Sequence, residues 1–152
     1  MMRGILLFVV SGLLWGWSVA PVAAQASLIV AQSDQYGTYL TDSVGRAVYL
    51  FTADRQGAGE LQAASRCTDA CAQAWPPLTT TGQPQAGPQA QAALLGTIQR
   101  QEGTRQVTYN GWPLYYFAQD QPQSQPGGQE KKGFGGAWYL VQPQGMKVAA
   151  QP

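Results

Sequence analysis

The hexapeptide "YLFTAD" at residues 49–54 and the related "YYFAQD" at 115–120 both read Tyr, any residue, Phe, two further residues, Asp. The similarity extends upstream, because "GTYLTDSVGRAVYLFTAD" (37–54) aligns without a gap with "GTRQVTYNGWPLYYFAQD" (103–120). A duplication of this length indicates two copies of one structural unit. The motif within it is either a repeated functional site or a repeated part of the scaffold.

The duplication continues beyond the motif, since "AWPPLTTTG" (74–82) matches "AWYLVQPQG" (137–145). The sequence therefore predicts a single domain built from repeat units 27–82 and 93–145. The intervening residues 83–92 are rich in Gln, Pro and Gly, so we expect them to form a linker.

Each unit shows the pattern of a β-hairpin. Asn110 and Gly111 supply the two positive-φ residues of a type I′ turn between two β-rich runs, and Gly45 stands at the equivalent position of the first unit. A further strand is expected before each hairpin and at each Ala-Trp segment, with a helical turn at 68–74. We therefore predict an all-β fold of about eight strands, in which two four-strand units pack as a pseudo-two-fold sandwich or barrel.

The aromatic residues of the motif lie on one face of a strand. Tyr49 and Phe51 share a face of the strand predicted at 46–52, and aliphatic residues share the other face; Tyr115 and Phe117 repeat this arrangement. A strand that is apolar on both faces is expected to be central and covered on both sides. These rings are therefore predicted to be core residues, and a stacking platform for a ligand ring is the alternative.

The N-terminus has the features of a secretory leader. Arg3 precedes the apolar run "GILLFVVSGLLWGWSVA", and Ala24-Gln25-Ala26 fits the small-x-small pattern that signal peptidase cleaves. We expect residues 1–26 to be a signal peptide and the mature chain to begin at Ser27, in the periplasm or the medium. A retained membrane anchor is the alternative, because the run is close to the roughly 17 residues that a spanning helix needs.

The charge balance excludes some classes of partner. Nine Lys and Arg face eight Asp and Glu, and loss of Arg3 with the leader leaves a net charge near zero. We therefore expect no nucleic-acid partner and no stable membrane insertion after cleavage. The domain at 27–145 is long enough to bury one core, and 146–152 form a C-terminal tail.

The two cysteines, Cys67 and Cys71, both lie in the exported part of the chain. An oxidising compartment favours a disulfide between them. The alternative is a copper or redox site, since a C-x3-C pair can hold a soft metal. Such a site normally recruits imidazole or further sulfur ligands, yet the chain has no His, and Met146 is the only Met after the leader.

Any chemistry beyond the cysteines depends on Asp54 and Asp120. Without His, the sequence offers no Ser-His or Cys-His nucleophile pair and no imidazole-based zinc site. Two carboxylates can serve acid–base hydrolysis or line a shared calcium site, although the sequence has no dense run of oxygen ligands. The simpler interpretation is that each Asp follows a strand and caps the next turn by accepting backbone N–H groups.

These motifs together resemble a known family. The paired Y-x-F-x-x-D motifs, the cysteines running into "WPPL" (75–78), "QVTYNGWPLYYF" (106–117) and "WYLV" (138–141) are similar to bacterial secreted repeat proteins, predicted lipoproteins with a Tyr-x-(Phe/Trp/Tyr)-x-x-Asp motif. The match covers residues 36–145. It implies an exported, duplicated module of unestablished role, and it supplies no catalytic residue. Many relatives are lipid-anchored, but no Cys lies near the predicted cut, so we expect a form without lipid.

We interpret the chain as an exported, non-catalytic binding or envelope-structural module that needs no cofactor. Its partner is expected to be an envelope protein or a small ligand. A redox or copper-handling protein that uses Cys67 and Cys71 is the first alternative. A hydrolase that uses Asp54 and Asp120 is the second.

Overall fold

The computed structural model describes residues 25–149, in which almost all regular structure is β. The predicted signal peptide lies almost entirely outside this part of the chain, as does the end of the C-terminal tail. Nine short strands are present within the described residues, together with one short α-helix and one 3-10 helix. The elements are β1 (Ser27–Ser33), β2 (Gly37–Asp42), β3 (Tyr49–Phe51), α1 (Ala70–Ala74), β4 (Gln85–Ala86), η1 (Ala92–Leu94), β5 (Leu95–Gln99), β6 (Arg105–Tyr109), β7 (Trp112–Pro113), β8 (Lys132–Gly133) and β9 (Gly136–Leu140).

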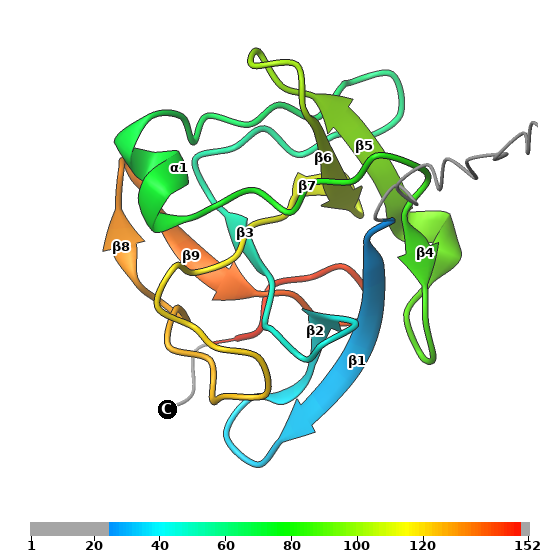
Figure 1. The fold of residues 1–152 in the computed structure, drawn as a ribbon, viewed down its shortest axis with the longest axis vertical. Helices are drawn as coiled ribbons and strands as arrows, with labels where there is room; N and C mark the ends of the chain where they lie inside the picture. Colours follow the sequence, from blue (N-terminus) through cyan, green and yellow to red (C-terminus); the bar gives the residue numbers. More distant parts are fainter. Residues whose placement is uncertain (1–24, 150–152) are drawn as a thin grey trace, which may run out of the picture.

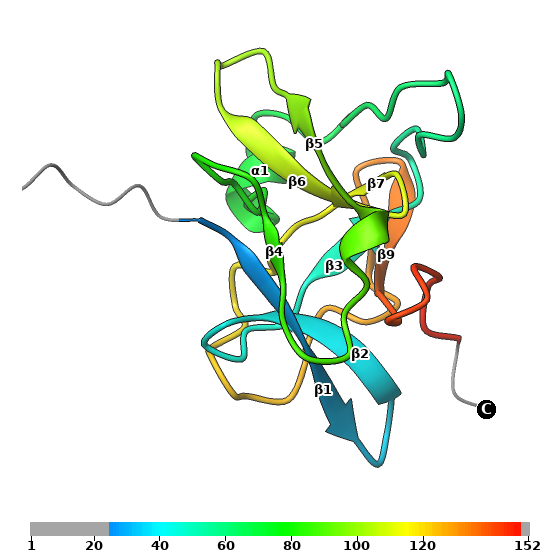
Figure 2. The same cartoon turned by 90° about the vertical axis from the view of Figure 1, so that its right-hand side faces the viewer.

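The strands form three small sheets with the orders β2-β1-β4, β3-β9-β8 and β5-β6-β7 (Figure 1). Figure 2 shows the β1–β2 and β5–β6 hairpins at opposite ends of the molecule, with β3 and β9 between them. The sheets pack in a sandwich-like arrangement and do not close into a barrel in the described residues. The predicted all-β, duplicated fold is therefore confirmed in its sandwich form.

The two central hairpins differ at their turns. Asn110 and Gly111 have φ angles of 48° and 75°, as a type I′ turn requires. In the first repeat, the Asp42 carboxylate accepts backbone N–H groups from Val44 (3.0 Å) and Arg46 (2.9 Å), which closes a longer turn. Hydrogen bonds to the Asp42 side chain thus stabilise the turn in the first repeat, whereas the positive φ angles of Asn110 and Gly111 form it in the second.

The longer turn displaces the strand before it by one residue. Leu40 and Val107 each accept one backbone hydrogen bond from the strand after the turn and donate one to an Ala-Trp segment, so these two residues are equivalent. The ungapped alignment pairs Leu40 with Gln106 instead, and it is wrong by one residue in this strand. The bonds are Val48 N–H to Leu40 O (3.2 Å), Leu40 N–H to Val141 O (2.8 Å), Leu114 N–H to Val107 O (3.0 Å) and Val107 N–H to Leu78 O (2.8 Å).

The Y-x-F strand of each repeat pairs with the Ala-Trp segment of the other repeat. β3 lies antiparallel to β9, with Phe51 opposite Trp138. The equivalent pairing joins residues 114–118 to residues 74–78, so the repeats are interlocked rather than placed side by side. Its backbone bonds are Leu78 N–H to Leu114 O (2.9 Å), Tyr116 N–H to Pro76 O (2.8 Å) and Ala118 N–H to Ala74 O (2.9 Å).

Two prolines prevent the second pairing from becoming a regular strand. Pro76 and Pro77 stand where β9 has Tyr139 and Leu140, and proline has no N–H to donate. Pro77 still forms an isolated bridge with Tyr115. The two prolines predict either an edge strand or an extended strap at this place, and the structure has the strap.

The stretch predicted as a linker contributes structure of its own. Within 83–92, β4 adds to β1 in parallel, with Gln85 opposite Ser27 and Ala86 opposite Leu28. The chain then enters η1, which leads directly into β5.

β3 separates two buried clusters. Tyr49 and Phe51, both 0% exposed, belong to an aromatic cluster, whereas Val48 and Leu50 belong to an aliphatic one. This is the two-sided burial that the alternation of residues predicts. The aromatic cluster is a stack in the order Phe51, Trp138, Trp75 and Phe117, with successive ring centroids 4.0, 4.0 and 4.5 Å apart.

Loss of either phenylalanine from the stack is expected to lower the free energy of unfolding by about 3–5 kcal/mol, because the missing ring leaves a cavity. Phe51→Ala and Phe117→Ala test this by chemical denaturation. Phe134→Ala is the control, since Phe134 is 52% exposed and surface changes usually stay within about 0.5 kcal/mol. Unchanged stability of both stack variants would contradict a scaffold role for the motif.

Candidate functional site

The two motifs meet where the repeats are related by the pseudo-two-fold axis. Tyr49 and Tyr115 exchange both backbone hydrogen bonds, with N–H to O distances of 2.8 and 2.9 Å. Their hydroxyls then cross to the opposite repeat: Tyr115 donates to Asp54 Oδ2 (2.6 Å), and Tyr49 donates to Asp120 Oδ2. Each motif tyrosine is thus bound to the motif aspartate of the other repeat. We call these two Tyr–Asp pairs the crossed latches.

The second carboxylate oxygen of each aspartate holds a loop of its own repeat. Asp54 Oδ1 accepts the Arg66 N–H (2.7 Å), and Asp120 Oδ1 accepts the Gly127 N–H (2.9 Å). Backbone N–H groups are therefore bound as predicted, but they lie 12 and 7 residues farther along the chain. The expectation that each Asp caps the turn directly after its strand is wrong, because the carboxylates point across the core instead.

Burial changes the acidity of the latch in the first repeat. Asp54 is 7% exposed, and desolvation raises its pKa to about 6. The N–H of Arg66, the hydroxyl of Tyr115 and the charge of Arg100 act in the opposite direction but only offset part of this rise. Asp54 therefore becomes protonated at a higher pH than a solvent-exposed Asp.

The latch tyrosines keep their protons throughout the ordinary pH range. Burial is the main cause that raises the pKa of Tyr49, and its hydrogen bond to Asp120 adds to the rise. For Tyr115, burial is followed by the charge of the Asp54 carboxylate. Both hydroxyls are thus hydrogen-bond donors in the latches and are poor proton acceptors for catalysis.

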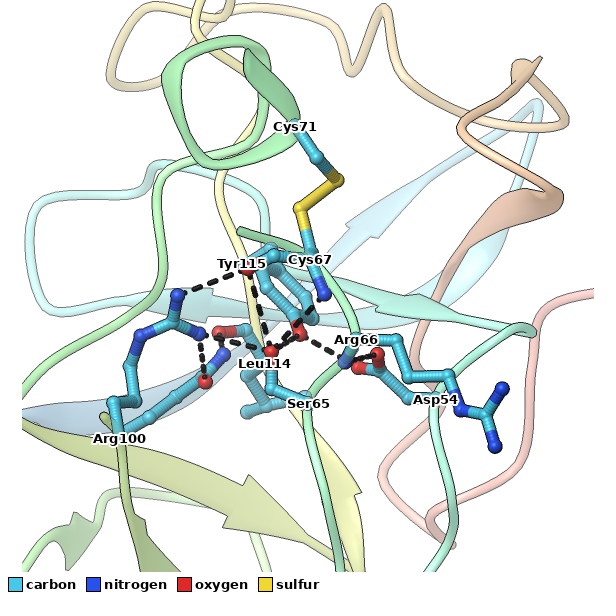
Figure 3. The surroundings of a disulfide bond; sticks show 9 residues. Asp54, Ser65, Arg66, Cys67, Cys71, Arg100, Leu114 and Tyr115 are labelled. Carbon is cyan, nitrogen blue, oxygen red and sulfur yellow. Dashed lines mark hydrogen bonds between the residues drawn. A yellow bond between two sulfur atoms is a disulfide. The ribbon is translucent and has the colours of Figure 1, made fainter. Parts of the chain in front are cut away.

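Cys67 and Cys71 form the predicted disulfide, with their Cα atoms 5.1 Å apart. Figure 3 shows Cys67 above the ring of Tyr115, with Arg100 to one side and Asp54 to the other. Cys67 is 0% and Cys71 5% exposed. The disulfide therefore fixes the loop that Asp54 also holds, and its sulfur atoms are covered by the core.

Arg100 completes this region, although no motif in the sequence points to it. Its guanidinium donates to Ser65 Oγ (2.9 Å), Gln106 Oε1 (2.8 Å) and the Cys67 carbonyl (2.9 Å), and it pairs with Glu102. An Arg at the end of a predicted strand is normally solvated, so no sequence pattern marked it. Its role depends on a loop more than 30 residues away, which the fold brings to it.

The two motif aspartates do not meet in a shared site. Asp54 and Asp120 bind different tyrosines and different loops, and the described residues contain no group of three or more His, Cys, Asp or Glu placed to hold a metal. A hollow of about 210 Å³ lies beside Ser65, Thr68 and Arg100, and no motif residue or cysteine lines it. The crossed latches are buried hydrogen bonds that join the two repeats.

These features define a class of protein: a duplicated all-β module whose repeats exchange their central pairing partners. Residues 30–79 and 96–142 match the model of a family described as a secreted repeat of unknown function, and the chain belongs to this family. No curated protein and no solved structure matches it. Across residues 25–149, no helix has the length and apolar character that crossing a membrane requires.

Removal of one latch hydroxyl is expected to lower the free energy of unfolding by about 1–3 kcal/mol, because a buried carboxylate loses a hydrogen-bond donor. Tyr49→Phe and Tyr115→Phe are the test. Tyr139→Phe is the control, since the Tyr139 hydroxyl makes no hydrogen bond within residues 25–149 and contacts Lys147 through its ring. A double-mutant cycle of Tyr115→Phe with Asp54→Asn measures the coupling, and a coupling energy of zero would show that the latch adds nothing.

Asp54 is also expected to make stability depend on pH. Its pKa is about 6 when folded and 3.8 for an ordinary Asp, so the folded state binds the proton more tightly. This contribution is complete below about pH 4 and is lost as the pH rises through 6, by on the order of 2–3 kcal/mol. Melting temperatures between pH 4 and 7 should therefore fall for the wild type relative to Asp54→Asn. Parallel pH profiles of the two proteins would refute the assignment.

Proposed function

We propose that the chain is an exported, non-catalytic module that binds a partner or forms part of the cell envelope. The supporting observation is that the side chains suited to chemistry are already used inside the fold. The carboxylates and hydroxyls bind one another, and the sulfur atoms are joined. A substrate reaches these groups only if the core opens, which is the opposite of a preformed catalytic cleft. The residues concerned are Asp54, Asp120, Tyr49, Tyr115, Cys67 and Cys71.

In this proposal the Y-x-F-x-x-D motif is scaffold. The rings of Phe51 and Phe117 cap the two ends of the buried Trp stack, so neither offers an open platform for a ligand ring. Binding is then left to loops and sheet edges at the surface, which a rigid core holds in place.

Export is part of the proposal. The family is described as secreted, and the leader pattern ends at Ala24-Gln25-Ala26. We propose that residues 1–26 are removed, that the mature chain starts at Ser27 without lipid, and that it acts in the periplasm or the medium.

Protein recovered from an exporting bacterium tests this function against the redox alternative. Its intact mass is expected to correspond to residues 27–152 with one disulfide and no acyl group. Metal analysis after reduction is expected to find no stoichiometric copper, because the cysteines lack further soft ligands. The double variant Cys67→Ala/Cys71→Ala should still fold and lose at most about 2–3 kcal/mol, since the disulfide closes a small loop.

Two results would overturn the proposal. Stoichiometric copper that binds the reduced wild type and not the double cysteine variant would establish a metal-handling protein. A hydrolytic activity that disappears in both Asp54→Asn and Asp120→Asn, with melting temperatures unchanged, would establish a hydrolase.

A further inference from the structure

The outer edge of β5 has no neighbouring strand in the described residues. In the described residues β5 pairs with β6 only. At the two ends of this pairing, the Asn110 N–H binds the Leu94 carbonyl (2.8 Å) and the Arg100 N–H binds the Thr104 carbonyl (2.9 Å). Even-numbered residues of β5 therefore direct their backbone groups toward β6, and odd-numbered residues direct theirs away from it. The outward-facing groups without a partner in this part of the chain are the Leu95 carbonyl and the N–H and carbonyl groups of Thr97 and Gln99.

The sequence of β5 has neither of the side-chain features, charge and proline, that commonly protect a strand edge. Its sequence, LGTIQ, contains no charged residue and no proline, whereas natural edge strands are commonly blocked by Lys, Pro or a bulge. Figure 2 shows no other strand beyond β5, although the loop between β3 and α1 extends past it. An unprotected edge of this kind is a template for an added strand.

The first repeat shows how such an edge is filled. Val30 lies opposite Leu40, and Thr97 lies opposite Val107, so β1 and β5 are equivalent strands. β4 adds to the outer edge of β1 in parallel, through Gln85 N–H to Ala26 O and Gly87 N–H to Leu28 O, both 2.8 Å. The added segment is short, extended and uncharged.

Within residues 25–149 the second repeat has no equivalent of β4. The chain after β9 turns back on itself instead, with the Val148 N–H bound to the Leu140 carbonyl (2.8 Å) and the Val148 side chain buried in the aromatic cluster. As far as Ala149, the C-terminal segment therefore packs against β9 and the aromatic cluster and does not lie beside β5. β4 lies beside Ser27 and Leu28, whose equivalents in the second repeat are Leu94 and Leu95. No strand lies beside Leu95, Thr97 and Gln99 in the described residues.

The surface beside this edge is hollowed on both faces of the sheet. One hollow of about 540 Å³ lies between loop residues 57–63 and the face of β5 that carries Gly96 and Ile98. Another of about 490 Å³ lies on the face that carries Gln99 and Arg105. A strand added to β5 directs alternate side chains to these two faces, so the hollows give room for both sets.

We propose that the edge of β5 binds an extended, uncharged segment of a partner protein, which adds to the sheet as a parallel strand. Its backbone bonds are of the kind that β4 makes to β1, but they lie two residues farther along the strand. Two N–H groups of the segment bind the carbonyls of Leu95 and Thr97, and two of its carbonyls accept the N–H groups of Thr97 and Gln99. Backbone bonds give the affinity, and the hollows select the side chains. This inference rests on the proposed function and locates its binding surface.

The test uses the mature chain, residues 27–152, and a peptide that copies residues 83–90, QPQAGPQA, with blocked ends. In a ¹H–¹⁵N NMR titration, the amide signals of Thr97 and Gln99 are expected to shift, and their hydrogen exchange is expected to slow. Thr97→Pro removes one outward N–H at an edge position where proline is tolerated, so it should weaken binding by about tenfold or more. Thr97→Val keeps the N–H and should bind within about twofold of the wild type.

A control peptide with proline in place of Gln85 and Gly87 lacks both donors and should not shift these signals. Melting curves of the two Thr97 variants verify that each is folded. No shift of the β5 amides at millimolar peptide would refute the proposal, as would a concentration-dependent homodimer that protects the same amides without peptide. Neither result affects the copper and hydrolase tests, so failure here is distinguishable from failure of the proposed function.

Discussion

The exchange of central strands between the repeats is the constraint on which the remaining structure depends. The paired backbones of Tyr49 and Tyr115 set the register at the axis, and this places Trp138 opposite Phe51 on the neighbouring strand. The equivalent pairing brings Trp75 against Phe117, so the two indoles stack 4.0 Å apart at the centre. Neither repeat can pair its central strand or bury its aromatic face without the other, and each one therefore depends on its copy for folding.

The crossed latches add specificity to this exchange. A strand that is apolar on both faces can slip along its partner with little hydrophobic penalty, because one apolar side chain replaces another. A buried carboxylate tolerates no such slip, since displacement by one residue leaves it without the tyrosine hydroxyl. The latches at Asp54 and Asp120 therefore cost desolvation energy but make the correct register distinct from its neighbours.

The loops that follow the two motif aspartates differ in length and in the contacts that hold them. The loop after Asp54 is secured by the disulfide and by Arg100. The shorter loop after Asp120 is held by N–H groups of Gly127 and Gly128, which bind the Asp120 carboxylate and the Tyr49 hydroxyl, and by close backbone approach. A Cβ atom on Gly128 would lie 2.8 Å from the rings of Tyr49 and Trp75, so the chain can pass there only as glycine. The duplicated core is thus nearly symmetric, while the periphery is not. The short strand β4 beside β1, which has no counterpart beside β5 in residues 25–149, is part of this asymmetry.

The sequence by itself determined the duplication, the all-β class, the type I′ turn at Asn110-Gly111, the burial of Tyr49 and Phe51 on a two-sided strand, and the Cys67–Cys71 disulfide. These follow from local signals: alternation with a period of two, turn chemistry, and a cysteine pair in an exported chain. Family membership followed from the same motifs.

Only the tertiary structure decided which repeat supplies the hydrogen-bond partner of each motif tyrosine and the pairing partner of each central strand. Whether Tyr115 binds Asp54 or Asp120 depends on how two similar units interlock, and equivalent residues carry the same local signal in both. The buried role of Arg100, the one-residue shift at Leu40 and the conversion of the linker into β4 depend likewise on long-range packing. The strap at Pro76-Pro77 was predictable from missing N–H groups, but its partner strand was not, because backbone pairing between distant segments leaves no pattern in either segment alone.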